Sequence, residues 1–195
     1  IDQPVRAFRI VRERPVDSRF EAIHGASLAP FIGRVHELGI LLERWELART
    51  EQGQAVFVSG EPGIGKSRLI QVLAEKAAEK PHTLLWLQCS PYHQNSAFYP
   101  VIQRLSRAAG FLKDDTDEQR LGKLETLLAD NGEDAPSVCA LYAELLSIDT
   151  HGRYPTPELA PQQRKDLMLQ TLVNRLTLMS KRSPVLLIIE DAHWI

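Results

Sequence analysis

The chain has 195 residues, of which 44% are hydrophobic and 25% are charged, and its formal net charge at pH 7 is -2. These proportions are typical of a globular protein with a packed core, and the interspersed acids and bases exclude the basic charge pattern of a nucleic-acid binder. The apolar run at residues 185–189 is far shorter than the ~20 residues that cross a bilayer, so we expect a cytoplasmic protein with no membrane or nucleic-acid partner.

Residues 1–29 are predicted to be an extended tail or linker from a preceding domain. The chain begins with Ile rather than Met, and its first eleven residues alternate loosely between apolar and charged positions. Residues 12–29 show neither a helical nor a strand period. We therefore expect residues 30–195 to form one domain of a longer protein.

Periodicity in the next part of the chain predicts alternating helices and strands. Apolar residues at helical spacing predict an amphipathic helix from Val35 to about Arg49. The runs at 55–59 and 83–88 predict two strands, and residues 68–80 between them predict a helix. This order implies that the two strands form a parallel pair with a right-handed crossover.

The junction between the first of these strands and its helix carries the most specific motif. Residues 60–67 read Gly-Glu-Pro-Gly-Ile-Gly-Lys-Ser, which fits the phosphate-loop pattern of Gly, four free positions and Gly-Lys-Ser. Glycines let successive backbone N–H groups point inward at a polyphosphate. Lys66 can reach the β and γ phosphates, and Ser67 can ligate Mg²⁺ at the start of a helix whose dipole favours an anion. The motif predicts a nucleoside triphosphate site.

Four further helices are predicted at about residues 100–110, 117–129, 136–147 and 162–181, and a fully buried strand at residues 185–189.

The loop after residue 88 lies at the carboxyl end of a strand, where loops of parallel sheets commonly face a ligand. His93 and Asn95 in this loop could approach the γ phosphate or lie in solvent. Cys89 and His93 offer only two metal ligands, whereas structural zinc sites use four, so we expect no zinc site.

Glu190 and Asp191 follow the last predicted strand directly. In a phosphate-loop enzyme one carboxylate beside the loop holds the Mg²⁺ shell together with the loop serine, and a second one orients or deprotonates the attacking water. A strand end that simply reaches solvent is the alternative. The pair therefore marks the candidate second half of an active site.

Three stretches together resemble the signal-transduction ATPases of the AAA-related STAND class: Phe31–Arg34, Gly60–Ser67 and Leu186–Trp194. Residues 89–101 also resemble the branch in which a class III adenylate/guanylate cyclase domain precedes the ATPase and helical repeats follow it, and residues 1–10 are similar to the end of such a cyclase domain. The resemblance implies ATP and Mg²⁺ as cofactors and the neighbouring domains as partners. It leaves a homo-oligomer open.

The fold implied by the resemblance is an α/β P-loop NTPase whose parallel sheet is flanked by helices in three layers, with a helical insert. The domain would be truncated after the second acidic motif and incomplete at its carboxyl end. By the resemblance, residues 31–34 line the adenine side, and Glu190 and Asp191 are the metal-side and water-activating acids. The family more often has Asp at the first acidic position, so the division of roles between the two carboxylates stays open.

The candidate site contains three sets of residues. The catalytic candidates are Lys66, Glu190 and Asp191, and the metal candidates are Ser67, Glu190 and Asp191. The nucleotide-binding candidates are Phe31, Gly33, Arg34, Gly60, Glu61, Pro62, Gly63, Ile64, Gly65, Lys66, Ser67 and Arg68.

The function predicted from these motifs is an ATP-binding, slowly hydrolysing regulatory module, with a nucleotide cyclase as one conceivable output. A switch GTPase usually has Asp-x-x-Gly after the second strand, whereas Asp191 is followed by Ala, His and Trp. A small-molecule kinase fits poorly with the long helical insert between Lys66 and Glu190. A scaffold that binds ATP without hydrolysing it fits the same motifs and remains an alternative.

Overall fold

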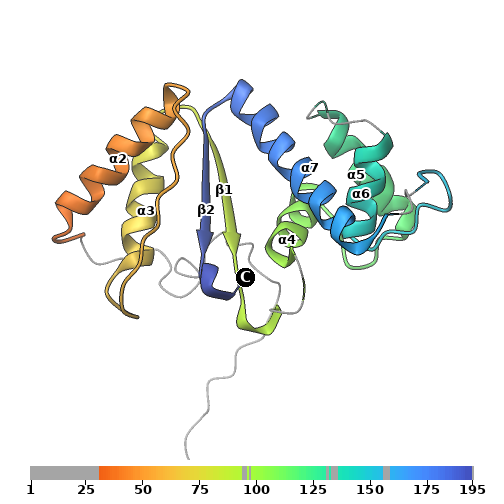
Figure 1. Ribbon diagram of the computed structural model, residues 1–195, viewed down its shortest axis with the longest axis horizontal. Helices are drawn as coiled ribbons and strands as arrows, with labels where there is room; N and C mark the ends of the chain where they lie inside the picture. Colours follow the sequence, from red (N-terminus) through yellow and green to blue (C-terminus); the bar gives the residue numbers. More distant parts are fainter. Residues whose placement is uncertain are drawn as a thin grey trace, which may run out of the picture.

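The structure is a computed structural model that describes residues 31–93, 96, 98–130, 132, 136–155 and 159–194. The predicted tail at residues 1–29 and the loop residue Asn95 lie outside this described part. Figure 1 shows helices on both sides of a short pair of strands. The order along the chain is α2, α3, β1, η1, α4, α5, α6, α7, β2 and η2.

The sheet consists of two parallel strands in the described part of the chain, β1 (Thr83–Gln88) and β2 (Val185–Glu190). Both strands were predicted at these positions, but their pairing with each other was not. The pairing predicted between residues 55–59 and 83–88 is wrong, because β1 pairs with β2 in a register that places Thr83 opposite Val185 and Gln88 opposite Glu190. The strand that follows the phosphate loop is therefore joined to the strand that carries the acidic pair.

The segment 55–59 is not a strand, contrary to the prediction. Its side chains face solvent at Val56 and Phe57, and Phe57 is 93% exposed. A β-branched run forms a strand only where a neighbour supplies partners for its backbone groups, and no described strand lies beside this segment. The expected third strand is thus absent from the described sheet.

The prediction that β2 is fully buried is also wrong. Ile188 is buried, but Leu187 and Ile189 are 36% and 44% exposed. Side chains alternate between the two faces of a strand, so one face of β2 is packed and the other is partly open. Within the described residues, β1 is the only strand that pairs with β2.

The phosphate loop is attached to a small core between α2 (Val35–Arg49) and α3 (Lys66–Ala77). Buried apolar side chains from both helices pack together there, and Leu186 of β2 packs against them. The buried members are Leu41, Trp45, Leu69, Leu73 and Ala77. This core fixes the helix that begins at the loop against both α2 and the sheet.

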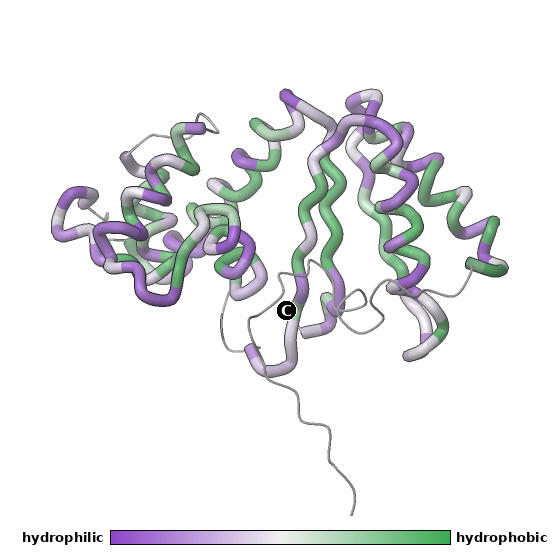
Figure 2. The backbone as a smooth tube through the Cα atoms, turned by 180° about the vertical axis from the view of Figure 1, so that it is seen from behind, coloured by the Kyte–Doolittle hydropathy of each residue, from purple (hydrophilic) through white to green (hydrophobic). Residues whose placement is uncertain are grey.

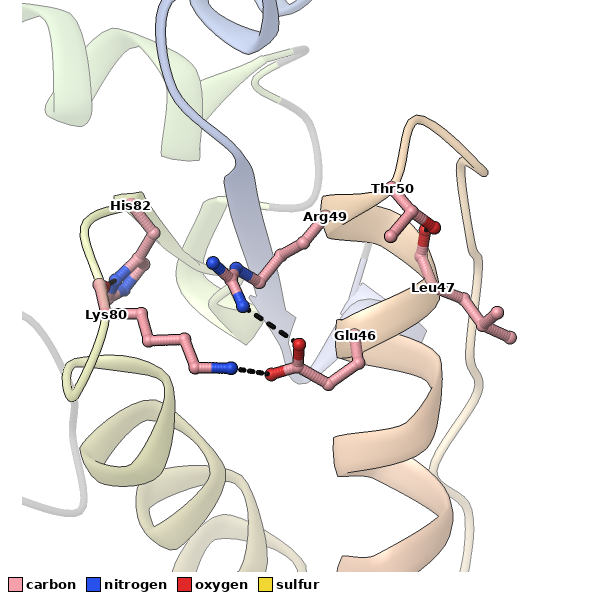
Figure 3. Close-up of polar contacts among 6 residues, drawn as sticks. All are labelled: Glu46, Leu47, Arg49, Thr50, Lys80 and His82. Atoms are coloured by element: carbon pink, nitrogen blue, oxygen red, sulfur yellow. Dashed lines mark hydrogen bonds and ion pairs between the residues drawn. The ribbon is translucent and has the colours of Figure 1, made fainter.

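Polar contacts join the carboxyl-terminal ends of α2 and α3, as Figure 3 shows. The Glu46 carboxylate of α2 accepts from Lys80, just after α3, at 3.0 Å and from Arg49 at 2.8 Å. Lys80 and then Arg49 lower the pKa of Glu46. His82 lies edge-on to Trp45, with ring centroids 5.6 Å apart, so the turn between α3 and β1 is fastened to α2.

A second core lies among the remaining helices, which Figure 1 shows on the other side of the strands. These helices are α4 (Tyr99–Ala108), α5 (Asp117–Asp130), α6 (Pro136–Leu145) and α7 (Pro161–Arg182). The four helices agree with those predicted from periodicity. Among the side chains of this core, Leu121, Leu124, Leu128 and Tyr142 are nearly or completely inaccessible to solvent. α4 contacts β1 and α7 contacts β2, so this helical unit is attached to the sheet.

Hydropathy follows this arrangement. Figure 2 shows hydrophobic residues along the middle of both strands and hydrophilic residues toward the carboxyl ends of the strands. No described helix combines the length and the apolar character needed to cross a membrane. The helices, loop and parallel strands are consistent with an α/β fold, while the three-layer arrangement remains a prediction.

Candidate functional site

The backbone of the phosphate loop adopts positive φ angles at its three glycines. Gly60, Gly63 and Gly65 have φ values of 155°, 79° and 94°. Gly65 is in the left-handed region and occupies the N-cap position of α3, where no side chain caps the helix. The N–H groups in the first turn of a helix have no partners within the helix, so an uncapped first turn offers donors to an anion.

The ammonium group of Lys66 lies against the loop. Its Nζ donates to the carbonyl oxygens of Gly60 and Glu61, both at 2.9 Å. A lysine ammonium group has three donors, and these two contacts leave one for a phosphate oxygen. Lys66 therefore both closes the loop and places a positive charge beside it.

The acidic pair lies where β2 ends. Glu190 is the last residue of β2, and Asp191 follows it with a left-handed φ of 55°. The Asp191 carbonyl accepts from the N–H of Trp194 at 2.9 Å, which closes the short helical turn η2 (Ala192–Trp194). The backbone therefore turns between the two carboxylates, and they occupy different surroundings.

Each carboxylate accepts a hydrogen bond from β1. The indole Nε1 of Trp86 donates to Glu190 Oε2 at 3.0 Å, and the amide Nε2 of Gln88 donates to Asp191 Oδ2 at 3.1 Å. Sequence reasoning missed both donors. The alternation of side chains along 83–88 places Trp86 and Gln88 on one face, but only the register with β2 shows which acids they meet.

The loop and the acids come from different elements but lie at the same end of the molecule. Figure 1 shows the loop before α3 and the carboxyl ends of β1 and β2 on its lower side. In the described part of the chain, no three His, Cys, Asp or Glu side chains are grouped to hold a metal. Mg²⁺ commonly takes one or two protein ligands together with substrate phosphates and water. Ser67, Glu190 and Asp191 carry oxygen donors of the kind that such an ion prefers, and their assignment to a metal stays a prediction.

The other predicted nucleotide-binding residues have varied positions. Phe31 packs partly buried against the α2–α3 core, and Gly33 and Arg34 both have positive φ values immediately before α2. Arg34 pairs with Glu37 at 3.3 Å. These contacts explain how residues 31–34 start the helix, and their adenine-side role stays a prediction.

Arg68 pairs with Glu75, two turns further along α3, at a distance of 3.5 Å. The guanidinium group is thus directed along the helix and away from the loop. This geometry gives Arg68 a structural contact, and its assignment to the nucleotide stays a prediction.

The loop after β1 holds Cys89 and His93, and of these two Cys89 contacts the acidic pair. Cys89 is buried, and its N–H donates to the carbonyl of Glu190 at 3.1 Å, which continues the strand pairing by one step. Burial, and then the charge of Asp191, raise the pKa of the Cys89 thiol, so it stays protonated and is a poor nucleophile. His93 stacks on Tyr99 with ring centroids 3.5 Å apart. Its approach to a phosphate stays a prediction.

Comparisons with known proteins agree with the motif. A family model described as AAA ATPase domain matches residues 30–195. An uncharacterized protein of Rhizobium meliloti (strain 1021) is 27% identical over 192 residues, which are 98% of this chain and 18% of that protein. The chain thus spans less than a fifth of the length of this relative. No solved structure matches the chain.

Proposed function

Because this chain belongs to the AAA ATPase domain family, we propose that it is an ATP-binding and slowly ATP-hydrolysing regulatory module of a larger protein. The observation that carries the proposal is the loop before α3, with three glycines at positive φ, an uncapped helix start and the Lys66 ammonium against two loop carbonyls. A loop of this kind presents donors and one positive charge to a polyphosphate.

In the proposed reaction, residues of the chain bind the phosphates, orient the attacking water and accept its proton. Lys66 and the loop N–H groups bind the phosphates, and Ser67 and the acidic pair would hold the metal and the water. Mg²⁺, when bound, would neutralise charge on the β and γ phosphates. One carboxylate would accept the proton of the attacking water as it bonds to the γ phosphorus and the bond to ADP breaks.

The larger assembly is proposed from the resemblance described above. A cyclase-like domain upstream and helical repeats downstream would be the neighbours that respond to the nucleotide state, in the cytoplasm, and self-association is a further contact to test. ATP would favour one arrangement of these neighbours, and hydrolysis would return the other, provided the two arrangements bind ATP with different affinities. The length of the Rhizobium relative supports a multidomain setting.

Replacing Lys66 with Ala tests nucleotide binding. The variant loses a charge-assisted contact of about 1.5–3 kcal/mol, so ATP affinity measured by calorimetry should fall about 10- to 150-fold. Lys76→Ala is the matched control, since Lys76 lies on the same helix but pairs with Glu79 at 3.0 Å. Equal ATP affinity in the wild type and the Lys66 variant would refute the assignment of the loop.

Replacing Asp191 with Asn tests turnover. The amide cannot accept the proton of water at neutral pH, so phosphate release should fall while ATP affinity stays within a few-fold of the wild type. Undiminished release would remove Asp191 from the water-activating role. A wild-type protein that binds ATP without any release would favour the non-hydrolysing scaffold.

A further inference from the structure

The contact between Trp86 and Glu190 joins the two strands of the sheet. Trp86 lies opposite Ile188 in the register, so Glu190 is two residues further along the partner strand on the same face. In this parallel pair the two residues are diagonal neighbours, and the long indole side chain spans the distance between them. The indole Nε1 donates to Glu190 Oε2 at 3.0 Å, and both side chains are partly buried.

The indole group suits a fixed contact. It is a donor only, and it does not change its charge at any pH at which the protein is folded. A hydrogen bond to an ionised acceptor is stronger than one between neutral groups. The bond takes one of the two acceptor sites of Glu190 Oε2, so this contact leaves both acceptor sites of Oε1 for a cation.

Glu190 needs such a contact more than an aspartate would. Its side chain has one more rotatable bond, and holding it in one rotamer costs more conformational entropy. Asp191 differs in all these respects, because it is shorter, follows a backbone turn at a φ of 55°, and accepts from the flexible amide of Gln88. A rigid donor therefore holds the longer acid, and an adaptable donor holds the shorter one.

We propose that Trp86 is a positioning residue that holds the carboxylate of Glu190, the metal-side acid implied by the resemblance, in place for Mg²⁺. The inference rests on the proposed ATP-binding function. It concerns the response of bound nucleotide to Mg²⁺, and nucleotide binding alone does not depend on it. Trp86 acts through Glu190 and does not itself touch the nucleotide.

The test compares Trp86→Phe with the wild type, using a non-hydrolysable ATP analogue. The variant keeps an aromatic ring and loses the N–H donor. In EDTA the two proteins should bind the analogue within twofold of each other. The Mg²⁺ concentration that gives half of the metal-dependent gain in affinity should rise about tenfold in the variant, the size expected for a lost hydrogen bond to a charged group.

The matched control is Trp45→Phe. Trp45 is buried in the core between α2 and α3, and its ring contacts that of His82. The control should leave the Mg²⁺ requirement unchanged. An unchanged requirement in Trp86→Phe as well would overturn the proposal, whereas a wild type that binds no analogue in either condition would instead overturn the proposed function.

A second measurement needs no change at Trp86. The chain has three tryptophans, whose indole N–H groups give three NMR signals in labelled protein, and Trp45→Phe and Trp194→Phe identify that of Trp86 by elimination. Adding Mg²⁺ to the protein loaded with the analogue should shift the Trp86 signal, and the shift should disappear in Glu190→Gln. A Trp86 signal that Mg²⁺ does not move would contradict the proposal.

Discussion

Replacing Gly65 with Ala should lower either the free energy of unfolding or the affinity for ATP. Gly65 has a φ of 94° and a ψ of 19° at the N-cap of α3, and a Cβ atom added there would meet no atom within 4 Å. The cost is therefore conformational and not steric. For a residue with a Cβ, the left-handed conformation costs about 1–2 kcal/mol of conformational energy. The free energy of unfolding should fall by that amount if the loop keeps its shape.

If the loop instead relaxes, the N–H groups of the first turn of α3 no longer converge, and the same cost appears in binding. A loss of about 1–2 kcal/mol corresponds to an affinity about 5- to 30-fold lower. Urea denaturation measures the first outcome, and calorimetry with ATP measures the second. A Gly65→Ala protein as stable as the wild type, with ATP affinity within twofold, would refute the reasoning.

Gly122→Ala is a matched control, for which the change in the free energy of unfolding should have the opposite sign. It lies inside α5 (Asp117–Asp130), has no positive φ, and a Cβ there would also meet nothing within 4 Å. Alanine costs less backbone entropy than glycine when a helix forms, so Gly122→Ala should raise the free energy of unfolding by about 0.5–1 kcal/mol. Its ATP affinity should not change.

Two further substitutions test the helical unit. Leu124 is 0% exposed, so Leu124→Ala should lower the free energy of unfolding by about 2–5 kcal/mol in urea denaturation; a loss below 1 kcal/mol would mean that this core is loosely packed. The backbone N–H of Leu112 at 2.7 Å, and then the Lys123 ammonium at 2.6 Å, lower the pKa of Asp115. The ionised Asp115 therefore stabilises the fold above the ordinary pKa of an aspartate, and this stabilisation is lost as the pH falls through the lowered pKa. Asp115→Asn should melt a few degrees below the wild type at pH 7, and this difference in melting temperature should close as the pH falls below about 4. A difference that persists at low pH would contradict this ionic role.

Local patterns in the sequence were sufficient for most of the secondary structure. The helix at Val35–Arg49 and the strand at Thr83–Gln88 occur where apolar spacing predicted them, because both patterns act over a few residues. The segment 55–59 carries the same local signal as β1, yet it is not a strand. Strand formation depends on a neighbour that can be far away in the sequence, and no local pattern contains that information.

The sequence motifs were enough to name candidate site residues, whose roles stay predictions, but not to predict the contacts that these residues make. The loop motif gave the glycines and Lys66, and the position after an apolar run gave the acidic pair. The bonds of Lys66 to the loop carbonyls depend on how the loop closes. The donors on β1 depend on a register between residues about one hundred positions apart, which the sequence of a single chain does not specify.

The open side of β2 has a consequence for how the molecule behaves among its own copies. The backbone groups that form a sheet ladder are the same in every strand, so an available edge does not distinguish a strand of its own chain from one of another molecule. Leu187 and Ile189 add apolar surface beside that edge. Strands of the same chain and strands of other copies would therefore compete for this edge, and a higher protein concentration favours pairing between molecules.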